Sequence, residues 1–308
     1  MNGAGERWKH PGRTWRRHKG LILMILPCLA FFAVFHYTPM TGVIIAFKDF
    51  TMSKGILGSP GVGFDNFRRL FASSDFPNAL RNTIVISLLR LTFGFFAPII
   101  LALMLNEVRV SWYKRTIQTV TYIPHFLSWV ILGGIFLMMF SLRGPVNMAI
   151  NSVGFGSVEF LTKDAWFLFT LIVTGIWQAA GYGAVIYLAA LAGISPDLYE
   201  AAVVDGAGRW RQTVHVTLPC LVPTIITLFI LNLGHILNAG FDQIYNMYNP
   251  IVYGAADIID TYVLRRLMTM DFGLATAAGL FKSVAGLILV VAVNSVARRA
   301  SEGELGIY

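Results

Sequence analysis

The chain has 308 residues, of which 56% are hydrophobic and only 13% are charged, whereas soluble domains carry about 25% charged residues. This composition, with a mean hydropathy of +0.65, excludes an ordinary soluble domain and predicts an integral membrane protein. The net charge of +8 does not indicate a nucleic-acid partner, because the basic residues cluster outside the apolar runs, as the positive-inside bias of membrane proteins predicts.

The chain lacks the sequence marks of metal, redox and nucleotide sites. The two cysteines, Cys28 and Cys220, lie in or beside apolar runs and form no C-x-x-C motif. The six histidines lack the spacing of a zinc site, and there is no G-x-x-x-x-G-K-[ST] motif. We therefore expect no metal, no cofactor and no ATP binding by this chain itself.

Six apolar stretches approach the length of about 20 residues that a transmembrane helix needs. They are Leu21–Tyr37, Asn82–Leu105, Val120–Phe140, Ala165–Leu188, Leu221–Phe241 and Ala275–Ala297. The first is short enough for a cleaved signal peptide, but its basic head is long and no A-x-A cleavage site follows, which favours a retained span. The sequence thus predicts an all-α integral membrane protein with six transmembrane helices in the lipid bilayer.

Basic residues set the expected orientation. They cluster in the head (1–20), after the second span (109–115), before the fifth span (209–211) and after the sixth (298–299). If six spans alternate, all four clusters fall on one side, so this side and both termini are predicted to be cytoplasmic. The long first outer loop is also basic, and the outer pair Arg265 and Arg266 is not explained by this bias.

The stretch "ISPDLYEAAVVDGAGRWRQTVHVTLPCLVP" connects the fourth and fifth spans, and its residues indicate helices instead of a plain loop. Ser195 is a good N-cap, Pro196 suits the first helical position, and Asp197 lies in the first turn. Gly206 and Gly208 then break this helix and allow a sharp reversal before a second helical piece. The pattern predicts a rigid helix–turn–helix knob on the inner membrane face.

One face of the predicted knob is small-sided. Leu198, Ala201, Ala202 and Asp205 follow the i, i+3, i+4, i+7 spacing of a shared helix face. Such a face lets another surface approach closely, so the knob is suited to the groove of a partner protein. The alternative is an amphipathic loop that lies on the membrane surface.

Here the chain resembles a known family. "EAAVVDGAGRWRQTVHVTLP" is similar to the signature of permease subunits of binding-protein-dependent ABC importers, which is E-A-A, three residues, G, nine residues and I-x-L-P; Val216 stands where Ile is usual. In the family this loop is the coupling helix, which docks in a cleft of the ATP-hydrolysing subunit. The resemblance implies ATPase-coupling roles for Glu200, Ala201, Ala202, Asp205, Gly206, Leu218 and Pro219.

The resemblance extends over nearly the whole chain. Segments such as "FHYTPMTGVIIAFKDF", "GFDNFRRLF" and "YIPHFLSWV" look like the branch that imports oligosaccharides or polysaccharide fragments, similar in arrangement to alginate and maltose importers; Gly61 stands where an aromatic residue is expected. It implies a type I ABC importer transmembrane domain in a bacterial inner or plasma membrane. The implied partners are a second permease subunit, a homodimeric ATP-binding subunit, an extracytoplasmic solute-binding protein and a sugar substrate.

On this basis the chain divides into four parts. These are a basic cytoplasmic tail (1–20), a first span with its outer loop (21–78), the importer transmembrane domain (79–298) and a second cytoplasmic tail (299–308). The transmembrane domain holds five spans and the coupling loop 194–219. The implied mechanism is alternating access driven by the separate ATPase, with no covalent chemistry on this chain.

Polar residues inside spans are candidates for the sugar pathway, because a central charge costs roughly 2.5–3.5 kcal/mol on insertion scales. On the fifth span, Asn232, His235, Ala239 and Asp242 have the spacing of one helical stripe. The fourth span offers Trp177, Gln178 and Tyr182, and aromatic rings with amide neighbours suit sugars. The alternative for each residue is hydrogen bonding between helices, within or between subunits.

Two basic residues within spans also need partners. Arg90 lies in the second span and Lys282 in the sixth. Asp242, Glu107 or a charge on the partner subunit are the candidates that the sequence leaves open.

Two other classes of protein remain as alternatives. A self-sufficient secondary transporter or channel would predict inverted repeats with broken helices, and the sequence shows none. A membrane-embedded enzyme would need a carboxylate or metal cluster, and the only close carboxylate pair outside the knob, Asp257 and Asp260, lacks matching histidines.

Overall fold

The computed structural model describes residues 11–234 and 236–300, and the side chains of 19–21, 23–234 and 236–295. All regular elements of the described chain are helices, joined by turns and loops, and there is one isolated bridge between Lys48 and Gly61. The all-helical prediction is therefore confirmed for this part of the chain.

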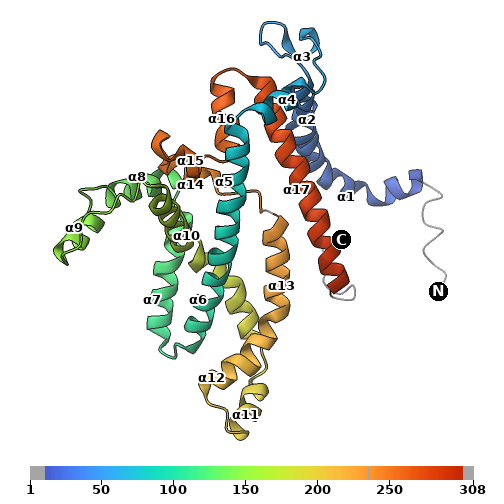
Figure 1. The fold of residues 1–308 in the computed structure, drawn as a ribbon. Helices are drawn as coiled ribbons and strands as arrows, with labels where there is room; N and C mark the ends of the chain where they lie inside the picture. Colours follow the sequence, from blue (N-terminus) through green and yellow to red (C-terminus); the bar gives the residue numbers. More distant parts are fainter. Residues whose placement is uncertain (1–10, 235, 301–308) are drawn as a thin grey trace.

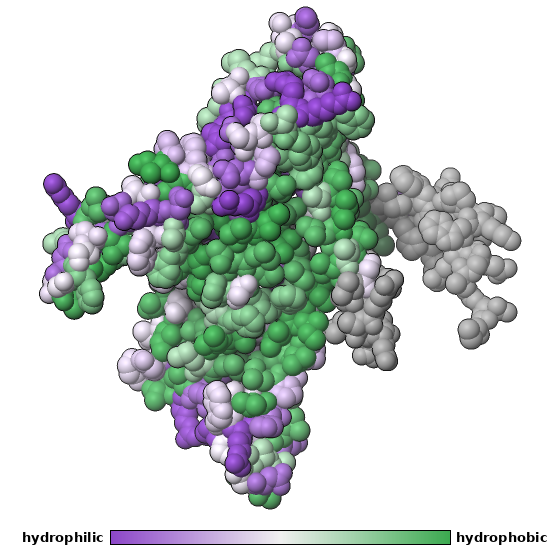
Figure 2. All heavy atoms as spheres, viewed as in Figure 1, coloured by the Kyte–Doolittle hydropathy of each residue, from purple (hydrophilic) through white to green (hydrophobic). Residues whose placement is uncertain are grey.

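Five helical segments are long and apolar enough to cross a membrane, or six if a bent pair counts as one span. The five are Lys19–Phe47, Asp75–Glu107, Asp164–Ala192, Arg209–Gly234 and Phe272–Ser295. The second comprises α5 (Asp75–Leu89), η3 (Arg90–Gly94) and α6 (Phe95–Glu107), the third is α10 (Asp164–Ala192), and the fifth lies in α17 (Phe272–Ala300). Figure 2 shows apolar residues over the middle of one face and hydrophilic residues gathered toward its two ends.

The first span is longer than predicted and stands largely alone. It runs through α1 (Pro11–Phe32), η1 (Ala33–Tyr37), α2 (Thr38–Met40) and η2 (Thr41–Phe47). The side chains described between Lys19 and Thr41 are exposed. Only η2 packs against α17, and α1 leads away from the other helices (Figure 1). Its apolar surface is therefore free for lipid or for another chain.

The predicted third span, Val120–Phe140, is not one straight helix. α7 (Ser111–Tyr122) and η4 (Ile123–Phe126) are bent by 104° from α8 (Trp129–Met139). Leu127 and Ser128 adopt extended backbone at the bend, three residues after Pro124. Because the apolar pattern continues across the bend, hydropathy alone does not reveal it.

The predicted fifth span is also too long. α13 (Leu218–Gly234) ends at Gly234, and α14 (Phe241–Met247) begins after Gly240, whose φ is +83°. The expected single polar stripe from Asn232 to Asp242 is therefore wrong, since the two residues belong to different helices. His235, which was part of that stripe, lies outside the described residues.

Three groups of buried apolar side chains hold the helices together. One joins η2, α4 (Asp65–Ala72), α5, α16 (Ile259–Met268) and α17; a second joins α5, α8, α10 and α14; a third joins α6, α10 and α13. Within a bilayer such contacts stabilise through close packing, for which small residues are suited. At Gly181 of α10 a Cβ would overlap the backbone of Thr121 in α7, so these helices touch closely.

The remaining helices are short and lie in the connections. They are α3 (Gly55–Gly58), α9 (Pro145–Ser152), η6 (Pro250–Val252) and α15 (Tyr253–Ala256). α16 and α4 lie at one end of the molecule, and the turn from α6 to α7 lies at the other (Figure 1).

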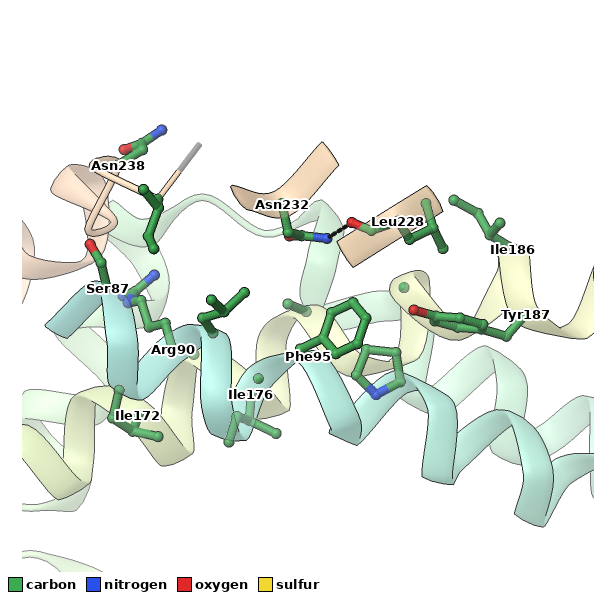
Figure 3. A pocket seen from close by; sticks show the side chains of 17 residues that line it. Ser87, Arg90, Phe95, Ile172, Ile176, Ile186, Tyr187, Leu228, Asn232 and Asn238 are labelled. Atoms are coloured by element: carbon green, nitrogen blue, oxygen red, sulfur yellow. Dashed lines mark hydrogen bonds between the residues drawn. The ribbon is translucent and has the colours of Figure 1, made fainter. Parts of the chain in front are cut away.

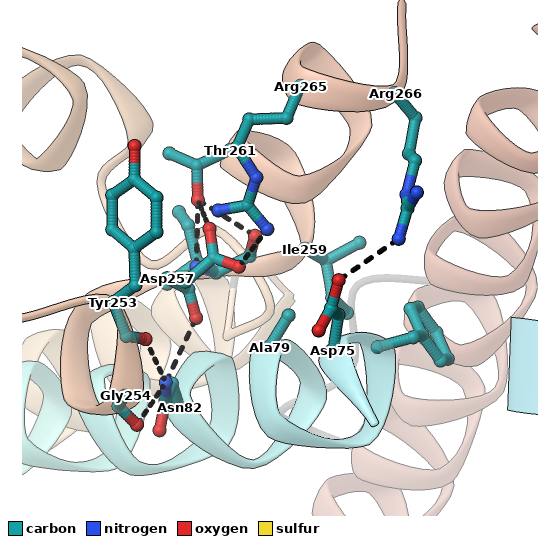
Figure 4. A network of polar contacts seen from close by, with 12 residues as sticks. Asp75, Ala79, Asn82, Tyr253, Gly254, Asp257, Ile259, Thr261, Arg265 and Arg266 are labelled. Carbon is teal, nitrogen blue, oxygen red and sulfur yellow. Dashed lines mark hydrogen bonds and ion pairs between the residues drawn. The ribbon is translucent and has the colours of Figure 1, made fainter. Parts of the chain in front are cut away.

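The two arginines that the charge bias did not explain have partners in the structure (Figure 4). Arg265 Nη2 lies 2.7 Å from Asp257 Oδ2, and its guanidinium covers the Tyr253 ring at 4.8 Å. Arg266 Nη2 lies 3.0 Å from Asp75 Oδ2. Both arginines thus tie α16 to neighbouring elements, which is a structural reason for their place.

A second set of polar contacts supports the same region. Asn82 Nδ2 donates to the carbonyl oxygens of Gly254 and Asp257, each at 3.1 Å. The pKa of the nearby Tyr248 phenol is raised, mainly by burial and to a lesser extent by its hydrogen bond with Tyr253, so this side chain stays neutral. The loop that follows α14 is therefore fixed to α5 by hydrogen bonds rather than by apolar contacts alone.

Candidate functional site

The predicted knob is present between α10 and α13. α11 (Pro196–Val204) begins as expected, because Ser195 Oγ accepts a hydrogen bond from Asp197 N at 3.3 Å. The cap satisfies one of the free N–H groups at the start of the helix. The N-terminal signal read from the sequence is confirmed.

The reversal after α11 is a Schellman motif, which is a common way to end a helix with glycine in the left-handed conformation. Ala207 N donates to Ala202 O at 2.8 Å, and Gly206 N donates to Val203 O at 3.0 Å. Gly206 has φ +75°, a value that disfavours side chains other than glycine. This glycine of the signature is thus explained by backbone geometry.

The second half of the knob is tied back to the first. It consists of α12 (Arg209–Gln212) and η5 (Thr213–Thr217), which continues into α13. Gln212 Nε2 donates to Ala207 O at 2.9 Å, and the Tyr199 hydroxyl and Thr217 Oγ1 are 3.0 Å apart. The sequence did not indicate these roles of Tyr199, Gln212 and Thr217. In the sequence they stand out only as polar residues beside apolar ones.

Most of the predicted coupling residues are free to meet a partner. Glu200, Ala201, Asp205, Gly206 and Pro219 are exposed, while Ala202 and Leu218 are partly buried. Around them lie exposed apolar side chains, namely Leu198, Val203, Val204 and Trp210. Trp210 is 78% exposed and Val204 87%, at the end of the molecule formed by α11 and α12 (Figure 1). Clustered exposed apolar groups are typical of a protein-binding surface.

The knob also contacts the turn between α6 and α7. Arg209 Nη1 lies 3.7 Å from Glu107 Oε2, with both side chains about half exposed. Such a pair contributes little to stability. The ion pair shows, however, that the basic stretches 109–115 and 209–211 lie at the same end of the molecule, as the predicted orientation requires.

A cavity of about 410 Å³ lies between the second span, α10 and α13. Its wall is mostly apolar, and its polar lining groups are Ser87, Arg90, Tyr187, Asn232 and Asn238 (Figure 3). An apolar pocket with a few converging polar groups is the usual form of a small-molecule site. Of the predicted pathway residues, Asn232 lines this cavity.

The other predicted residues of the fourth span face elsewhere. The Tyr182 ring stacks on the His125 ring with centroids 4.1 Å apart, and Gln178 Nε2 donates to His125 O at 3.4 Å. Trp177 meets Phe136 of α8 edge-on, with centroids 5.5 Å apart. Gln178 and Tyr182 therefore share one face of α10, as their spacing predicted. This face contacts His125 at the bend between α7 and α8 and does not line the cavity.

Asp242 lines neither the cavity nor the face of the fourth span that holds Gln178 and Tyr182. It is exposed in the first turn of α14, where Asn246 Nδ2 donates to its backbone carbonyl at 2.7 Å. The predicted pathway residues are therefore not gathered at one site within this chain, and their contact with a sugar stays a prediction.

Arg90 and Lys282 have partners other than the carboxylates expected. Lys282 Nζ lies 2.6 Å from both carboxylate oxygens of Asp260. Arg90 Nη2 donates to Gln243 Oε1. The candidates Asp242 and Glu107 are thus wrong, because α14 turns Gln243 rather than Asp242 toward the second span, and Glu107 pairs with Arg209.

Comparison with known proteins agrees with the geometry of the knob. Residues 94–302 match the family described as "Binding-protein-dependent transport system inner membrane component". The chain belongs to this family: it is an inner-membrane, multi-pass permease subunit of an ABC transporter, whose ATPase is a separate chain.

Particular relatives cover nearly the whole sequence. The chain is 45% identical to Protein LplB of Bacillus subtilis over 96% of this chain and 93% of that protein. It is 44% identical to the polygalacturonan/rhamnogalacturonan transport system permease protein YteP of the same organism, over 95% and 91%. A chain of the bacterial alginate ABC transporter, solved with an alginate pentasaccharide-bound periplasmic protein, matches with a TM-score of 0.88 at 41% identity, over 97% of this chain and 100% of that one. The fold is that of a type I ABC importer transmembrane domain.

Proposed function

We propose that this chain is one of two different permease subunits of an ATP-driven importer for oligosaccharides or polysaccharide fragments. The observation that carries the proposal is the exposed knob with its Schellman turn, in a chain similar to permeases of polygalacturonan and alginate transporters. The partners are a second permease, two copies of an ATP-binding subunit and an extracytoplasmic solute-binding protein. Both termini lie in the cytoplasm.

The structure suggests how motion at the knob reaches the cavity. The Tyr199 hydroxyl meets Thr217 at the end of η5, and α13 starts at the next residue, Leu218. Leu228 and Asn232 of α13 line the cavity. A displacement of α11 by the ATPase therefore moves one wall of the cavity, which is what alternating access requires.

Glu200→Lys tests the coupling role. Glu200 is exposed on α11, so reversing its charge should leave insertion and assembly intact. In proteoliposomes with all subunits, we expect binding-protein-stimulated ATP hydrolysis to fall by about tenfold or more, since an interfacial charge reversal costs several kcal/mol. Glu159→Lys makes the same change at an exposed site before α10 and should have no effect.

Two results would refute the proposal. Stimulated hydrolysis that survives Glu200→Lys would remove the knob from coupling. Sugar uptake by this chain alone, without ATPase and ATP, would favour a secondary transporter or channel.

A further inference from the structure

Arg90 occupies an unusual place for a cation. The span Asp75–Glu107 has its midpoint at Leu91, so Arg90 lies at the centre of a membrane-crossing helix. It also begins η3, a π-helical segment (Arg90–Gly94) within this span. Charged residues at this depth are costly and are usually paired or functional, and π-helical turns often mark functional sites.

The contacts of Arg90 leave its charge uncompensated. Gln243 Oε1 accepts from Nη2, and a Cβ at Gly240 would overlap the guanidinium. Gln243 Nε2 in turn donates hydrogen bonds to Leu171 O at 2.9 Å and to Thr174 Oγ1 at 2.7 Å. Among the described residues no carboxylate pairs with Arg90, and its Nε is buried without a hydrogen-bond partner.

Lys282 provides a contrast within the same protein. Its ammonium group is neutralised by Asp260 at 2.6 Å. Both residues line a second, shallower pocket that is open at the surface, about 450 Å³ in volume, which shares Asn238 with the cavity of Arg90. One of the two pockets therefore holds a compensated cation, and the other holds a cation that has no counter-ion among the described residues.

The surroundings of Arg90 suit an anion. Ser87 precedes Arg90 by three residues on the same helix face, and its buried Oγ has no hydrogen-bond partner within the described chain. Both side chains line the cavity, as do Asn232 of α13 and Asn238 (Figure 3). A guanidinium fork with a free hydroxyl matches the two oxygens of a carboxylate, and Phe95 offers an aromatic surface for the C–H face of a sugar ring.

We propose that Arg90 and Ser87 form a carboxylate subsite, which binds the acid group of a uronate-type saccharide as it passes through this chain. The inference rests on the proposed function and narrows its substrate class to acidic saccharides. A saccharide carboxylate at this point supplies the counter-charge that the described part of the chain does not supply. Because Arg90 keeps its contact with Gln243, the guanidinium still has a partner when the saccharide leaves.

Ser87→Asp and Ser87→Asn form a matched pair that tests the subsite. Aspartate at position 87 places a permanent carboxylate on the face of Arg90, whereas asparagine has nearly the same shape and no charge. ATP-driven uptake is measured with a uronate oligosaccharide and with the same oligosaccharide after its carboxyl groups are reduced to alcohols. The binding protein is the same throughout, so its own preference cancels when each variant is compared with wild type.

We expect Ser87→Asp to lower uronate uptake by about tenfold or more, as loss of a charged hydrogen bond implies, and to lower uptake of the carboxyl-reduced sugar much less. Ser87→Asn, whose amide N–H can still donate to a carboxylate, should shift the ratio of the two sugars much less than Ser87→Asp does. Arg90→Met and Arg90→Lys provide a second pair should Ser87→Asp not assemble: Met should lose uronate uptake selectively, and Lys should retain part of it.

The outcomes separate this inference from the proposed function. Equal effects of Ser87→Asp and Ser87→Asn, or equal loss of both sugars in Arg90→Met, would overturn the subsite and assign Arg90 to helix packing. A wild-type complex that imports neutral oligosaccharides but no uronate would overturn the subsite alone, whereas uptake that needs neither ATPase nor ATP would overturn the proposed function.

Discussion

Gly206→Ala adds one methyl group to the exposed turn between α11 and α12. A Cβ at Gly206 would meet no atom within 4 Å, so the effect comes from the backbone alone. Its φ of +75° lies in the left-handed region, which costs a residue with a Cβ roughly 1–2 kcal/mol.

Part of this cost is offset. Alanine restricts the unfolded chain more than glycine does, which returns about 0.4–1 kcal/mol. The net local destabilisation is about 1 kcal/mol, which lowers the equilibrium constant between the native turn and its alternatives about fivefold. Since only the native turn presents α11 correctly, the apparent affinity for the ATP-binding subunit should fall, by at most about the same factor.

Gly208→Ser is the matched control. Gly208 is also exposed with no atom near its Cβ position, but its φ is −70° and it caps α12. Serine is at least as good an N-cap as glycine, so binding should be unchanged. Gly206→Asn should lie between glycine and alanine, because asparagine tolerates the left-handed conformation better than most residues.

The assay is binding of the labelled ATP-binding subunit to the permease complex in nanodiscs, with stimulated ATP hydrolysis as a second measurement. An affinity of Gly206→Ala equal to wild type, or a loss that Gly208→Ser shares, would show that the left-handed turn does not determine docking.

Two further substitutions test the packing of the spans. Gly181→Ala should lower the stability of the solubilised complex by about 1–3 kcal/mol, as overpacking does, because its Cβ would overlap the Thr121 backbone; Gly134→Ala, with no atom near, is the control, and equal melting temperatures would contradict the close α7–α10 contact. Asp257→Asn should cost about 2 kcal/mol, less than the loss of a fully buried pair, since the Arg265 side chain is 30% exposed. Asp75, which pairs with Arg266 and is more exposed than Asp257, should cost at most about 1 kcal/mol of stability when it is changed to Asn. Chemical denaturation that ranks the two variants in the opposite order would refute the assigned strengths of these two ion pairs.

Local chemistry explains why much of the protein could be read from its sequence. Hydropathy located the membrane spans, because each apolar run acts through its own composition. The cap at Ser195 and the turn at Gly206 were readable because capping and φ preferences act over a few residues. The spacing from Glu200 to Pro219 was sufficient to indicate the family, which the match over residues 94–302 confirms.

Tertiary contacts decided the rest. The break between α13 and α14 lies within an apolar run, and its geometry is completed by Gln243 contacts to Leu171 and Thr174, about 70 residues earlier in the chain. The bend before α8 likewise brings Gly133 against Asn246. Such contacts depend on which helices become neighbours, and no local pattern encodes that.

The partners of the buried charges show the same division. The sequence determined that Arg90 and Lys282 lie inside spans and must be accounted for, because their neighbours are apolar. Only the folded chain gives Lys282 the counter-ion Asp260 and leaves Arg90 with the neutral Gln243. The reason is physical: the energy of a charge inside a membrane protein depends on what lies within a few ångströms of it, and the packing of distant helices sets those distances.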